Sequence, residues 1–493
     1  MLFAVSMTFI DQTIVAIATP ELTQELSLSR AGAQWMVNAY LVALAAVFAF
    51  GGRVADVVGH RRMVAIGVIG FAVSSALCGA TPTTSVAETW IIVFRIAQGV
   101  SAAFMVPAAI AVVISAFHRR ERGRALAIFF GVSGLFTAVG PIAGGYLTQW
   151  TWRAIFWVNL PIAAVALVLL SRAQVENRAT GERIDWRGAA LVAGGMGLSV
   201  LGLQQTQIWG WSSPWTWACI VVGLLTMVVF VRIELRTHHP LLRLEIFRGR
   251  AFLVDNGVLF FSMIAFVPVF FFASVYSQVS LGYNAGNAAF YLMFFFAGFA
   301  PSAQVSGRLF DARGAKLPLV LGCALGTVGF ALWALRITDL QLGSQWWAIV
   351  IAGAGIGFLL GPASTDASSR AIDASYGEVT GITQTVRNYG SSLGFAVLGS
   401  LLSTVFVGRL TTSLTGMGLP ASVAQEIAGR GSGPSANDPA TPAMQEAISQ
   451  AVQNDFATAT GSVLWGMAAA LAIAFAIAMQ HPGDRVGHDA EPA

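Results

Sequence analysis

The chain has 493 residues, of which 56% are apolar and only 11% are charged, and its mean hydropathy is +0.70. Because soluble domains average about a quarter charged residues, this composition excludes an ordinary soluble protein and indicates one that crosses a membrane many times. Every basic residue except Lys316 is an arginine. These arginines gather in short loops, so the pI of about 9.2 requires no nucleic-acid partner.

Apolar windows of roughly 20 residues, the length that crosses about 30 Å of hydrocarbon, predict fourteen membrane-spanning helices. They lie at about 2–20, 34–51, 63–81, 89–114, 123–147, 154–170, 188–207, 216–233, 251–273, 286–306, 317–335, 346–363, 379–404 and 459–480. The first window contains a cleavage-like Ala16-Ile17-Ala18, but no basic region precedes it and Asp11 interrupts it. We therefore expect an uncleaved first span and not a signal peptide.

The distribution of charge predicts the orientation of these spans. With both termini in the cytoplasm, 21 basic residues lie on the inner side, five lie outside, and Arg95 and Arg387 lie within spans. The positive-inside rule therefore places both termini in the cytoplasm, and the preference for arginine indicates the inner (plasma) membrane of a bacterium with GC-rich DNA. Tryptophans at the predicted outer ends are expected to anchor helices at the headgroups. These are Trp150, Trp152, Trp157, Trp209, Trp211, Trp215, Trp217, Trp346 and Trp347.

Asp11 lies near the middle of the first span, where an ionised carboxylate is costly unless it is paired, hydrated or protonated. Burial disfavours its charged form and a nearby cation favours it. A carboxylate balanced between these effects can take up a proton on one side of the membrane and release it on the other. The alternative is a polar anchor that bonds to neighbouring backbone.

Arg95 enters the fourth span from the outer side, about two turns deep. Its guanidinium does not usefully lose a proton, so Arg95 would hold water or tune a carboxylate. Gln98 lies one turn further on the same face and supplies a neutral partner. The alternative for Arg95 is a side chain that extends to the headgroups.

Two loops have nearly the same sequence. "GRVADVVGHRRM" (Gly52–Met63) joins the second and third spans, and "GRLFDARGAK" (Gly307–Lys316) joins the tenth and eleventh. Both read G-x-hydrophobic-x-D-x-x-G with basic residues after. If spans 1–6 and 9–14 are equivalent units, both loops connect the second and third spans of their unit. Such duplication is typical of secondary transporters, whose substrate site lies between the halves.

This duplication divides the chain into four parts. We expect a six-helix half at 1–170, an inserted helix pair with basic cytoplasmic loops at 171–250, a second six-helix half at 251–480 and a cytoplasmic tail at 481–493. Within the second half, residues 407–458 would form an extracellular loop rich in Gly, Pro, Ser and Ala. Its stretches "PASVAQEIAG" and "MQEAISQAVQNDF" can form short surface helices, and a passive connector is the favoured interpretation.

Four motifs make the chain resemble the major facilitator superfamily, specifically its fourteen-span drug:proton antiporter branch. They are "IDQTIVAIATP" (Ile10–Pro20), the loop Gly52–Arg62, "RIAQGVSAA" (Arg95–Ala103) and "FTAVGPIAGG" (Phe136–Gly145). "WRAIFWVNLP" and "GITQTVRNYGSSLG" are similar to this branch as well. The chain departs from the family pattern at four positions. These are Ala16 for asparagine, Val57 and His60 for basic residues, and Phe136 for glycine.

The resemblance implies an all-α integral membrane fold of two six-helix halves plus an inserted pair, and a multidrug efflux activity driven by protons. It implies that Asp11, Arg95 and Gln98 take part in proton coupling. It also implies that a glycine-rich cluster in the fifth span makes a tight, proton-sealing interface between the halves. That cluster consists of Gly140, Pro141, Gly144 and Gly145.

The paired loops predict a cytoplasmic gate. Asp56 is placed to accept hydrogen bonds from the N-terminus of span 13, near Ser375–Thr380. Gly52 and Gly59 would permit the tight turn, while Arg61 and Arg62 hold the loop at the cytoplasmic face. By symmetry Asp311 should face the start of span 5, near Arg122–Arg124. The other members of this second loop are Gly307, Gly314 and Lys316.

Arg387 lies about two turns into span 13, near its cytoplasmic end. It can bind an anionic group of a substrate or pair with Asp366, Asp373 or Glu378, and pairing is favoured. No second carboxylate lies in mid-membrane, because Asp255 is only one turn into its span. We therefore expect a mostly apolar pocket for amphipathic substrates that are neutral or monovalent.

The sequence offers no candidate catalytic, metal or nucleotide site. All histidines fall in loops or the tail, and the one lysine follows an alanine, so no phosphate-binding loop is present. We expect no enzyme activity, cofactor or metal, and a proton gradient as the energy source. The expected partners are a small-molecule substrate, protons and the lipid bilayer, with a monomeric chain and no nucleic acid.

Three functions remain open at this point. The leading one is a proton-driven exporter of drugs or toxic compounds that works by alternating access. The second is a dedicated exporter of an endogenous metabolite, a lipid precursor or a self-made antibiotic. A membrane sensor or enzyme that transports nothing is a remote alternative, because it would need a polar catalytic cluster or an extramembrane domain.

Overall fold

The computed structural model describes residues 1–117, 143–172, 185–237, 244–370, 376–430 and 442–483, together with single positions between 118 and 142. Over these residues every regular element is a helix. Twelve of the described helices are long and apolar enough to cross a membrane, and α1 contributes a shorter apolar segment at Leu2–Val15. The span predicted at 123–147 falls mostly outside the described residues.

The described helices of the first two thirds of the chain begin within about four residues of the predicted windows, but α1, α2, α11 and α12 continue about five to seven residues beyond them. The described helices of the first half are α1 (Leu2–Glu25), α2 (Arg30–Val58), α3 (His60–Gly79), α4 (Ala87–Ala116), α6 (Ala154–Trp157) and α7 (Asn159–Arg172). The inserted pair is α8 (Trp186–Gln204) and α10 (Pro214–Glu234), joined by the short α9 (Thr206–Trp209). The remaining elements are η1 (Leu244–Arg248), α11 (Arg250–Val279), α12 (Ala285–Arg313), α13 (Lys316–Arg336), η2 (Ile337–Asp339), α14 (Leu342–Ser369), α15 (Tyr376–Gly416), α16 (Ala421–Arg430) and α17 (Pro442–Ala478).

Local sequence explains where several helices begin. The Ser29 hydroxyl accepts a hydrogen bond from the Gly32 N–H at 2.8 Å and caps α2, and the Asn284 side chain caps α12 in the same way. Pro214 occupies the first turn of α10, where its missing N–H has no helical partner to lose. These caps fix the helices at the end of the bundle opposite the two repeated turns.

The two repeated stretches are almost entirely helical. α2 continues to Val58 and α3 begins at His60, so Gly59 alone makes the turn, with a φ of 104°. Gly314 makes the matching turn between α12 and α13 with a φ of 77°. The expectation that Gly52 shapes the turn was wrong, and Gly307 likewise lies within α12. Only the second glycine of each motif occupies a conformation that excludes a side chain.

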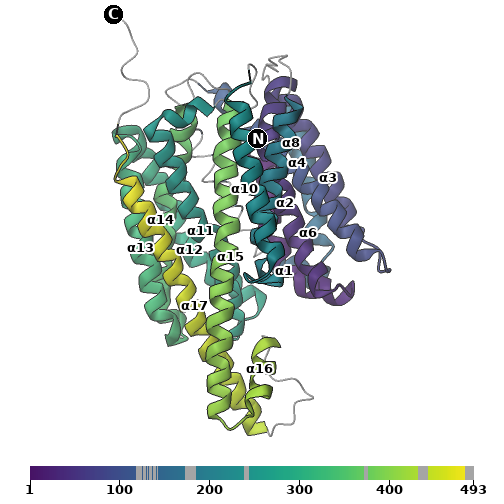
Figure 1. The fold of residues 1–493 in the computed structure, drawn as a ribbon, viewed down its shortest axis with the longest axis vertical. Helices are drawn as coiled ribbons and strands as arrows, with labels where there is room; N and C mark the ends of the chain where they lie inside the picture. The colour runs from purple at the N-terminus through teal and green to yellow at the C-terminus, as the bar shows by residue number, and fades with distance from the viewer. Residues whose placement is uncertain are drawn as a thin grey trace, which may run out of the picture.

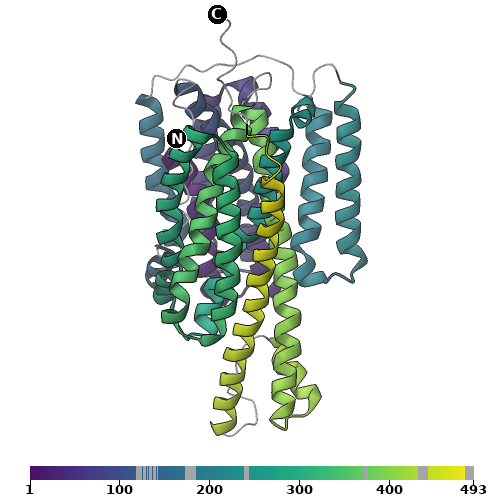
Figure 2. The same cartoon turned by 90° about the vertical axis from the view of Figure 1, so that its left-hand side faces the viewer.

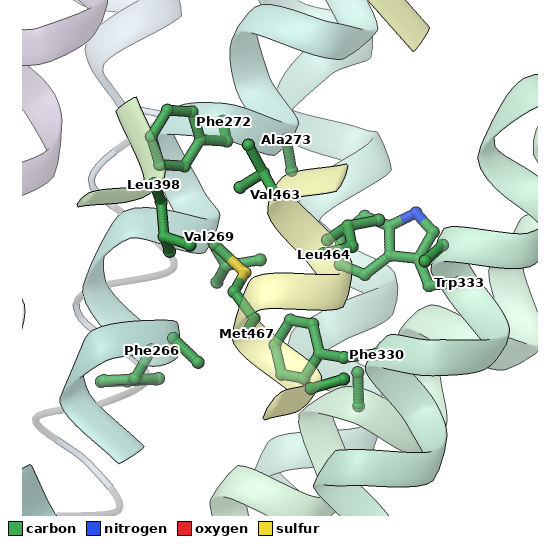
Figure 3. Close-up of a cluster of buried hydrophobic side chains, with 14 of the residues drawn as sticks. Phe266, Val269, Phe272, Ala273, Phe330, Trp333, Leu398, Val463, Leu464 and Met467 are labelled. Carbon is green, nitrogen blue, oxygen red and sulfur yellow. The ribbon is translucent and has the colours of Figure 1, made fainter. Parts of the chain in front are cut away.

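We call the end of the bundle that carries these two turns the basic end, after Arg61, Arg62, Arg313 and Lys316. The start of α1 and the end of α17 lie at this same end (Figures 1 and 2). Each half has its own apolar core. In the second half, side chains from α11, α13, α15 and α17 pack together (Figure 3), including Phe266, Trp333, Leu398 and Met467.

The inserted pair lies at one side of the bundle (Figure 2, right). α8 packs against both α2 and α15 and therefore covers the boundary between the halves, whereas α10 packs against α8. Gly195 and Gly223 let the two helices of the pair approach closely, because a Cβ at either position would meet the backbone of the partner helix. Much of α10 is exposed, as expected for a helix that faces lipid.

The segment predicted as a passive loop at 407–458 is largely helical. α15 and α17 run well past the other helices and project from the bundle together (Figures 1 and 2). Leu414, Ile448 and Phe456 are buried between them, and the rings of Phe406 and Phe456 are 5.2 Å apart. "PASVAQEIAG" forms α16 as expected, but "MQEAISQAVQNDF" is the first part of α17 and not a separate surface helix.

One tryptophan was wrongly assigned to the interface. Trp152 is buried, 2% exposed, and packs on Phe156 with the Arg153 guanidinium 4.3 Å from its ring centroid. Arg153 also donates to the carbonyl oxygens of Gly79 and Thr81. Trp152 is therefore part of the core that joins α6 to the end of α3. Trp150 and Trp215, in contrast, are strongly exposed, as expected for tryptophans that lie at the headgroups.

Candidate functional site

Asp11, Arg95 and Gln98 form one closed network inside the first half. Arg95 Nη1 donates to Asp11 Oδ2 and also to Gln98 Oε1, at 2.8 Å, and Gln98 Nε2 donates to Asp11 Oδ1 at 2.9 Å. The three side chains are at most 1% exposed. Arg95 therefore does not extend to the headgroups, and the carboxylate has a cation and a neutral donor on its two oxygens.

α2 completes the surroundings of the guanidinium. Arg95 Nε donates to the Met36 carbonyl oxygen at 3.0 Å, and the guanidinium carbon lies 4.5 Å from the centroid of the Tyr40 ring. Both contacts were missed, because a carbonyl oxygen and an ordinary tyrosine of a neighbouring span carry no sequence pattern. Together they hold the guanidinium against α2 as well as against Asp11.

Small residues of "RIAQGVSAA" explain how α4 comes so close to α2. A Cβ at Gly99 would collide with the Tyr40 carbonyl oxygen, and a Cβ at Gly51 would collide with the Ala103 carbonyl oxygen. Only glycine permits this backbone approach. The motif therefore places the α4 backbone against α2 and leaves Arg95 directed across toward α1.

The glycine cluster of the fifth span packs against α1 beside Asp11. A Cβ at Gly140 would collide with the Thr13 hydroxyl, and a Cβ at Gly144 would lie 2.9 Å from an Ile14 side-chain carbon. Gly145 is buried, and Pro141 lies outside the described residues. The glycines thus pack two and three residues along α1 from the carboxylate, and their role in sealing against protons stays a prediction.

The predicted gate residues of the first turn are anchored within the first half. Asp56 is buried, and His60 Nε2 lies 3.4 Å from its Oδ1. Arg61 Nη2 donates to the carbonyl oxygens of Leu170 and Ser171, at 3.2 and 3.1 Å, at the C-terminal end of α7. A cation at this position stabilises the unpaired carbonyls of a helix end. Arg62 is exposed.

Of the predicted partners of the two gate acids, the side chains of Val379 and Thr380 are described, and both are buried. Residues 371–375 and the side chains of 376–378 are not described, and neither is Arg122–Arg124. Asp311 and Arg313 are exposed at the basic end, and Lys316 is partly exposed. Both latch contacts therefore stay predictions.

The two halves meet beside these turns. Gly381 of α15 faces the Ala49 backbone of α2, since a Cβ at Gly381 would lie 3.3 Å from the Ala49 Cα. Around this contact Phe252, Ala367 and Val379 of the second half pack with Ala49 and with side chains of α8. We call this group the inter-half cluster. α2 and α15 run in opposite directions, so the end of α2 that carries Asp56 lies at the same end of the bundle as the start of α15. A contact between Asp56 and α15 stays a prediction.

Arg387 does not pair with Asp366, which was one of its favoured partners. Asp366 Oδ2 accepts from Arg370 Nε at 2.6 Å and lies 3.1 Å from His481 Nε2. Asp373 lies outside the described residues, and so does the Glu378 side chain. Arg387 is 8% exposed, which places its guanidinium inside the protein near the basic end and leaves a substrate or gate role as a prediction.

His481 was assigned to the cytoplasmic tail, and the structure buries its side chain. It is 1% exposed and lies among Asp255 of α11, Asp366 and Arg370 of α14, and Gly483. The sequence offered one clue, because "HPG" follows directly after the last apolar window. His481 follows the last helix, as expected, but its burial beside two carboxylates was not predicted.

A family model described as "Major Facilitator Superfamily" matches residues 1–395. The chain belongs to the Major Facilitator Superfamily. Within this superfamily it is 32% identical over 409 residues to the "Tetracenomycin C resistance and export protein" of Streptomyces glaucescens, covering 81% of this chain and 74% of that protein. It is 32% identical to the "Puromycin resistance protein pur8" of Streptomyces alboniger, covering 83% and 81%. It is 31% identical to the "Cephamycin export protein CmcT" of Amycolatopsis lactamdurans, covering 79% and 81%.

Solved structures show the same superfamily fold. The proton:xylose symporter XylE aligns with a TM-score of 0.58 and 12% identity, over 87% of this chain and 91% of XylE. A bacterial homologue of the human lysosomal transporter Spinster, in an inward-facing conformation, aligns with a TM-score of 0.54 and 16% identity, over 97% and 96%. With its twelve described spans, this member of the superfamily is a multi-pass protein of the plasma membrane.

Proposed function

We propose that the chain is a drug:proton antiporter that exports amphipathic, neutral or monovalent compounds by alternating access. The observation that carries the coupling is the buried network of Asp11, Arg95 and Gln98. A carboxylate that shares two donors with no solvent around it can exchange one of them for a proton when the helices move apart. The relatives named for antibiotic resistance and export support drugs as the cargo.

We propose fourteen spans with both termini in the cytoplasm. The twelve described spans, α1 and the window at 123–147 would complete this number. In this arrangement the basic end is cytoplasmic, and the inter-half cluster closes that side. The contact between α2 and α15 supports a state that opens to the outside, with Asp56 and Asp311 as latches that release when the halves rock.

The test is transport by the purified full chain in proteoliposomes with an imposed pH gradient. We expect a fluorescent cationic dye, such as ethidium, to enter the vesicles only when their lumen is more acidic than the outside. Protons should leave the vesicles at the same time, and this flow should be measurable. Collapse of the gradient by an ionophore should stop both. Dye movement that is unaffected by the ionophore would contradict proton coupling while leaving export intact.

A dedicated exporter of a self-made antibiotic is the second candidate, because two of the relatives are named for the export of a single antibiotic. Deletion and overexpression strains should be compared for susceptibility to a broad panel of compounds and for metabolites in the medium. Resistance to many unrelated compounds supports a drug exporter. An unchanged susceptibility profile with one secreted compound lost on deletion supports the dedicated exporter.

A further inference from the structure

Five arginines lie at the basic end of the inserted helix pair. Arg187 is in the first turn of α8, Arg232 is in the last turn of α10, and Arg236 follows directly after α10. Arg248 ends η1 and Arg250 begins α11. All five side chains are exposed. We call these five residues the arginine belt.

Contacts between the three elements bring the belt together. The start of α8 packs against the end of α10, since a Cβ at Gly188 would lie 3.1 Å from a Glu234 carboxylate oxygen. Phe247 of η1 packs against the inter-half cluster, which includes Ala189 of α8 and Phe230 of α10. The belt therefore surrounds one end of the pair, which lies at one side of the bundle (Figure 2).

The acidic side chains described at this end of the pair do not neutralise the belt. Glu234 lies between Arg232 and Arg236 in the sequence, yet it is only 3% exposed and faces α8. Asp185 Oδ1 accepts the backbone N–H of Arg187 at 2.9 Å and caps α8. Among the described residues, no carboxylate forms an ion pair with a guanidinium of the belt. The belt therefore presents its positive charge to its surroundings.

Arg232 continues the face of α10 that is exposed to lipid. Val221, Leu225 and Val228 form a stripe on this face and are 46%, 59% and 47% exposed. On a helical projection Arg232 lies about 20° from Val221, whereas Glu234 lies about 140° away. Orientation during membrane insertion explains positive charge at this end of the pair. It does not explain why the arginine continues the lipid-facing stripe while the acid is buried.

Arg187 has the same relation to α8. Ala190, Gly194 and Leu198 form an exposed stripe at successive turns, and a Cβ added at Gly194 would meet no atom within 4 Å. Arg187 lies about 20° from Gly194 on a helical projection. Each helix of the pair therefore has an apolar stripe that ends in an arginine.

The length of α10 places its arginines at the level of lipid headgroups. Trp215 and Trp217 are exposed at the opposite end of this helix and mark the other boundary of the hydrocarbon. A helical rise from Trp215 to Arg236 is about 31 Å, which matches the roughly 30 Å of the hydrocarbon core. Arg232 lies one turn deeper, and its long side chain can extend to the headgroups.

The same end of the second half presents charges of both signs. Arg308 and Arg313 of α12 are exposed there, and the carboxylate of Asp311, between them in the sequence, is exposed as well. Because like charges repel, an anionic headgroup is less favoured at α12 than at the arginine belt.

We propose that the arginine belt binds the phosphate of an anionic phospholipid, whose acyl chains lie along the exposed stripes of α8 and α10. Guanidinium groups suit phosphate because their donors match its oxygens, and arginines near the membrane surface attract anionic lipids. If the basic end is cytoplasmic, as proposed above, this lipid belongs to the inner leaflet. The proposal goes beyond drug export. Its tests need neither transport nor a proton gradient, so each proposal can fail without the other.

A local fluorophore tests the site in vesicles. Cys78→Ala, Cys219→Ala and Cys323→Ala remove the native thiols from the full chain, and Leu235→Cys, at a side chain that is 67% exposed beside Arg236, carries the fluorophore. Phosphatidylcholine vesicles contain a small, equal fraction of either phosphatidylglycerol or phosphatidylcholine with a nitroxide near the headgroup, which quenches a fluorophore close to it.

The belt should concentrate the anionic lipid beside this fluorophore. At low salt we expect phosphatidylglycerol to quench it at least about twofold more than phosphatidylcholine, because arginines near the surface attract the anionic headgroup. The difference should disappear in Arg232→Gln/Arg236→Gln. Equal quenching by the two lipids with the belt intact would overturn the proposal.

Two controls separate a site from a general attraction to the basic end. Arg308→Gln/Arg313→Gln removes two exposed charges from the same end and should keep the preference measured at Leu235→Cys. A fluorophore at Val305→Cys, at a side chain that is 53% exposed on α12, should show little difference between the lipids. Loss of the preference in both double variants, or an equal preference at Val305→Cys, would mean that the attraction is diffuse and that the belt is no site.

Added salts identify the occupant. Sodium chloride should weaken the preference for phosphatidylglycerol, because ions screen exposed charges. Sodium phosphate at the same ionic strength should weaken it no further. A stronger effect of phosphate would assign the belt to a soluble phosphate compound in place of a lipid.

Discussion

Arg95 of α4 and Asp11 of α1 form a salt bridge with no measurable exposure at Asp11 and 1% at Arg95. Gln98 bonds to both partners and Tyr40 covers the guanidinium. A pair buried to this degree contributes little net stability, because the cost of desolvation offsets the attraction between the charges. Removal of one partner, however, leaves the other as a buried charge without a counter-charge. Asp11 and Arg95 therefore act as a unit.

Asp11→Asn should abolish proton-coupled export and lower the free energy of unfolding by about 3–5 kcal/mol, because Arg95 remains buried without a counter-charge. The double variant Asp11→Asn/Arg95→Gln should regain most of the stability and none of the coupling. Denaturation and proteoliposome transport measure the two effects. Full coupled transport in Asp11→Asn would remove Asp11 from the mechanism.

Arg95→Lys should impair export although the charge is kept. A lysine carries its donors on one terminal nitrogen, so it should not reproduce the two hydrogen bonds that the guanidinium makes from separate atoms, Nη1 to the Asp11 carboxylate and Nε to the Met36 carbonyl. The loss of one charge-assisted hydrogen bond should lower the free energy of unfolding by about 1.5–3 kcal/mol. Arg336→Lys, at a side chain that is 55% exposed, is the matched control and should match wild type in both assays.

Gly59→Ala and Gly314→Ala should each destabilise the protein by about 1–3 kcal/mol, because their positive φ values exclude a side chain. Gly361→Ala, within α14 and with no atom within 4 Å of the added Cβ, should be neutral or stabilising by about 0.5–1 kcal/mol. Thermal unfolding of the three variants gives the comparison. Unchanged unfolding of Gly59→Ala would show that the turn adapts to a side chain.

Asp56→Ala should shift the protein toward the inward-open state. Asp56 lies on the part of α2 that leads from the Ala49–Gly381 contact to the start of α15, and an acid at a helix N-terminus is worth about 0.3–2 kcal/mol. Labelling of a cysteine at Ile382 from the cytoplasmic side should therefore be faster in Asp56→Ala than in Asp339→Ala. Equal rates would mean that Asp56 does not hold the cytoplasmic gate closed, and that the charged motif at Gly52–Met63 serves only to orient the protein in the membrane.

The spans, their order and the two glycine turns could be predicted from the sequence because they depend on local properties. A helix that crosses hydrocarbon must bury its backbone polar groups within itself and needs about 20 apolar residues. A glycine in a charged motif between two such helices predicts the position of the turn. Gly59 and Gly314 confirm this, because each lies between two helices with a positive φ. Composition misled at 407–458, where Leu414, Ile448 and Phe456 bury one another and extend two helices through a polar stretch.

Which side chains contact one another depended on the tertiary structure. Asp11 and Arg95 are 84 residues apart, and Asp366 and His481 are 115 apart; no local pattern links either pair. Sequence identified Asp11 and Arg95 as costly charges that needed partners, since hydrocarbon penalises any unpaired charge. Which partner each obtained depended on how closely glycines such as Gly99 let the helices approach, and His481 became buried only because α17 ends beside α11 and α14.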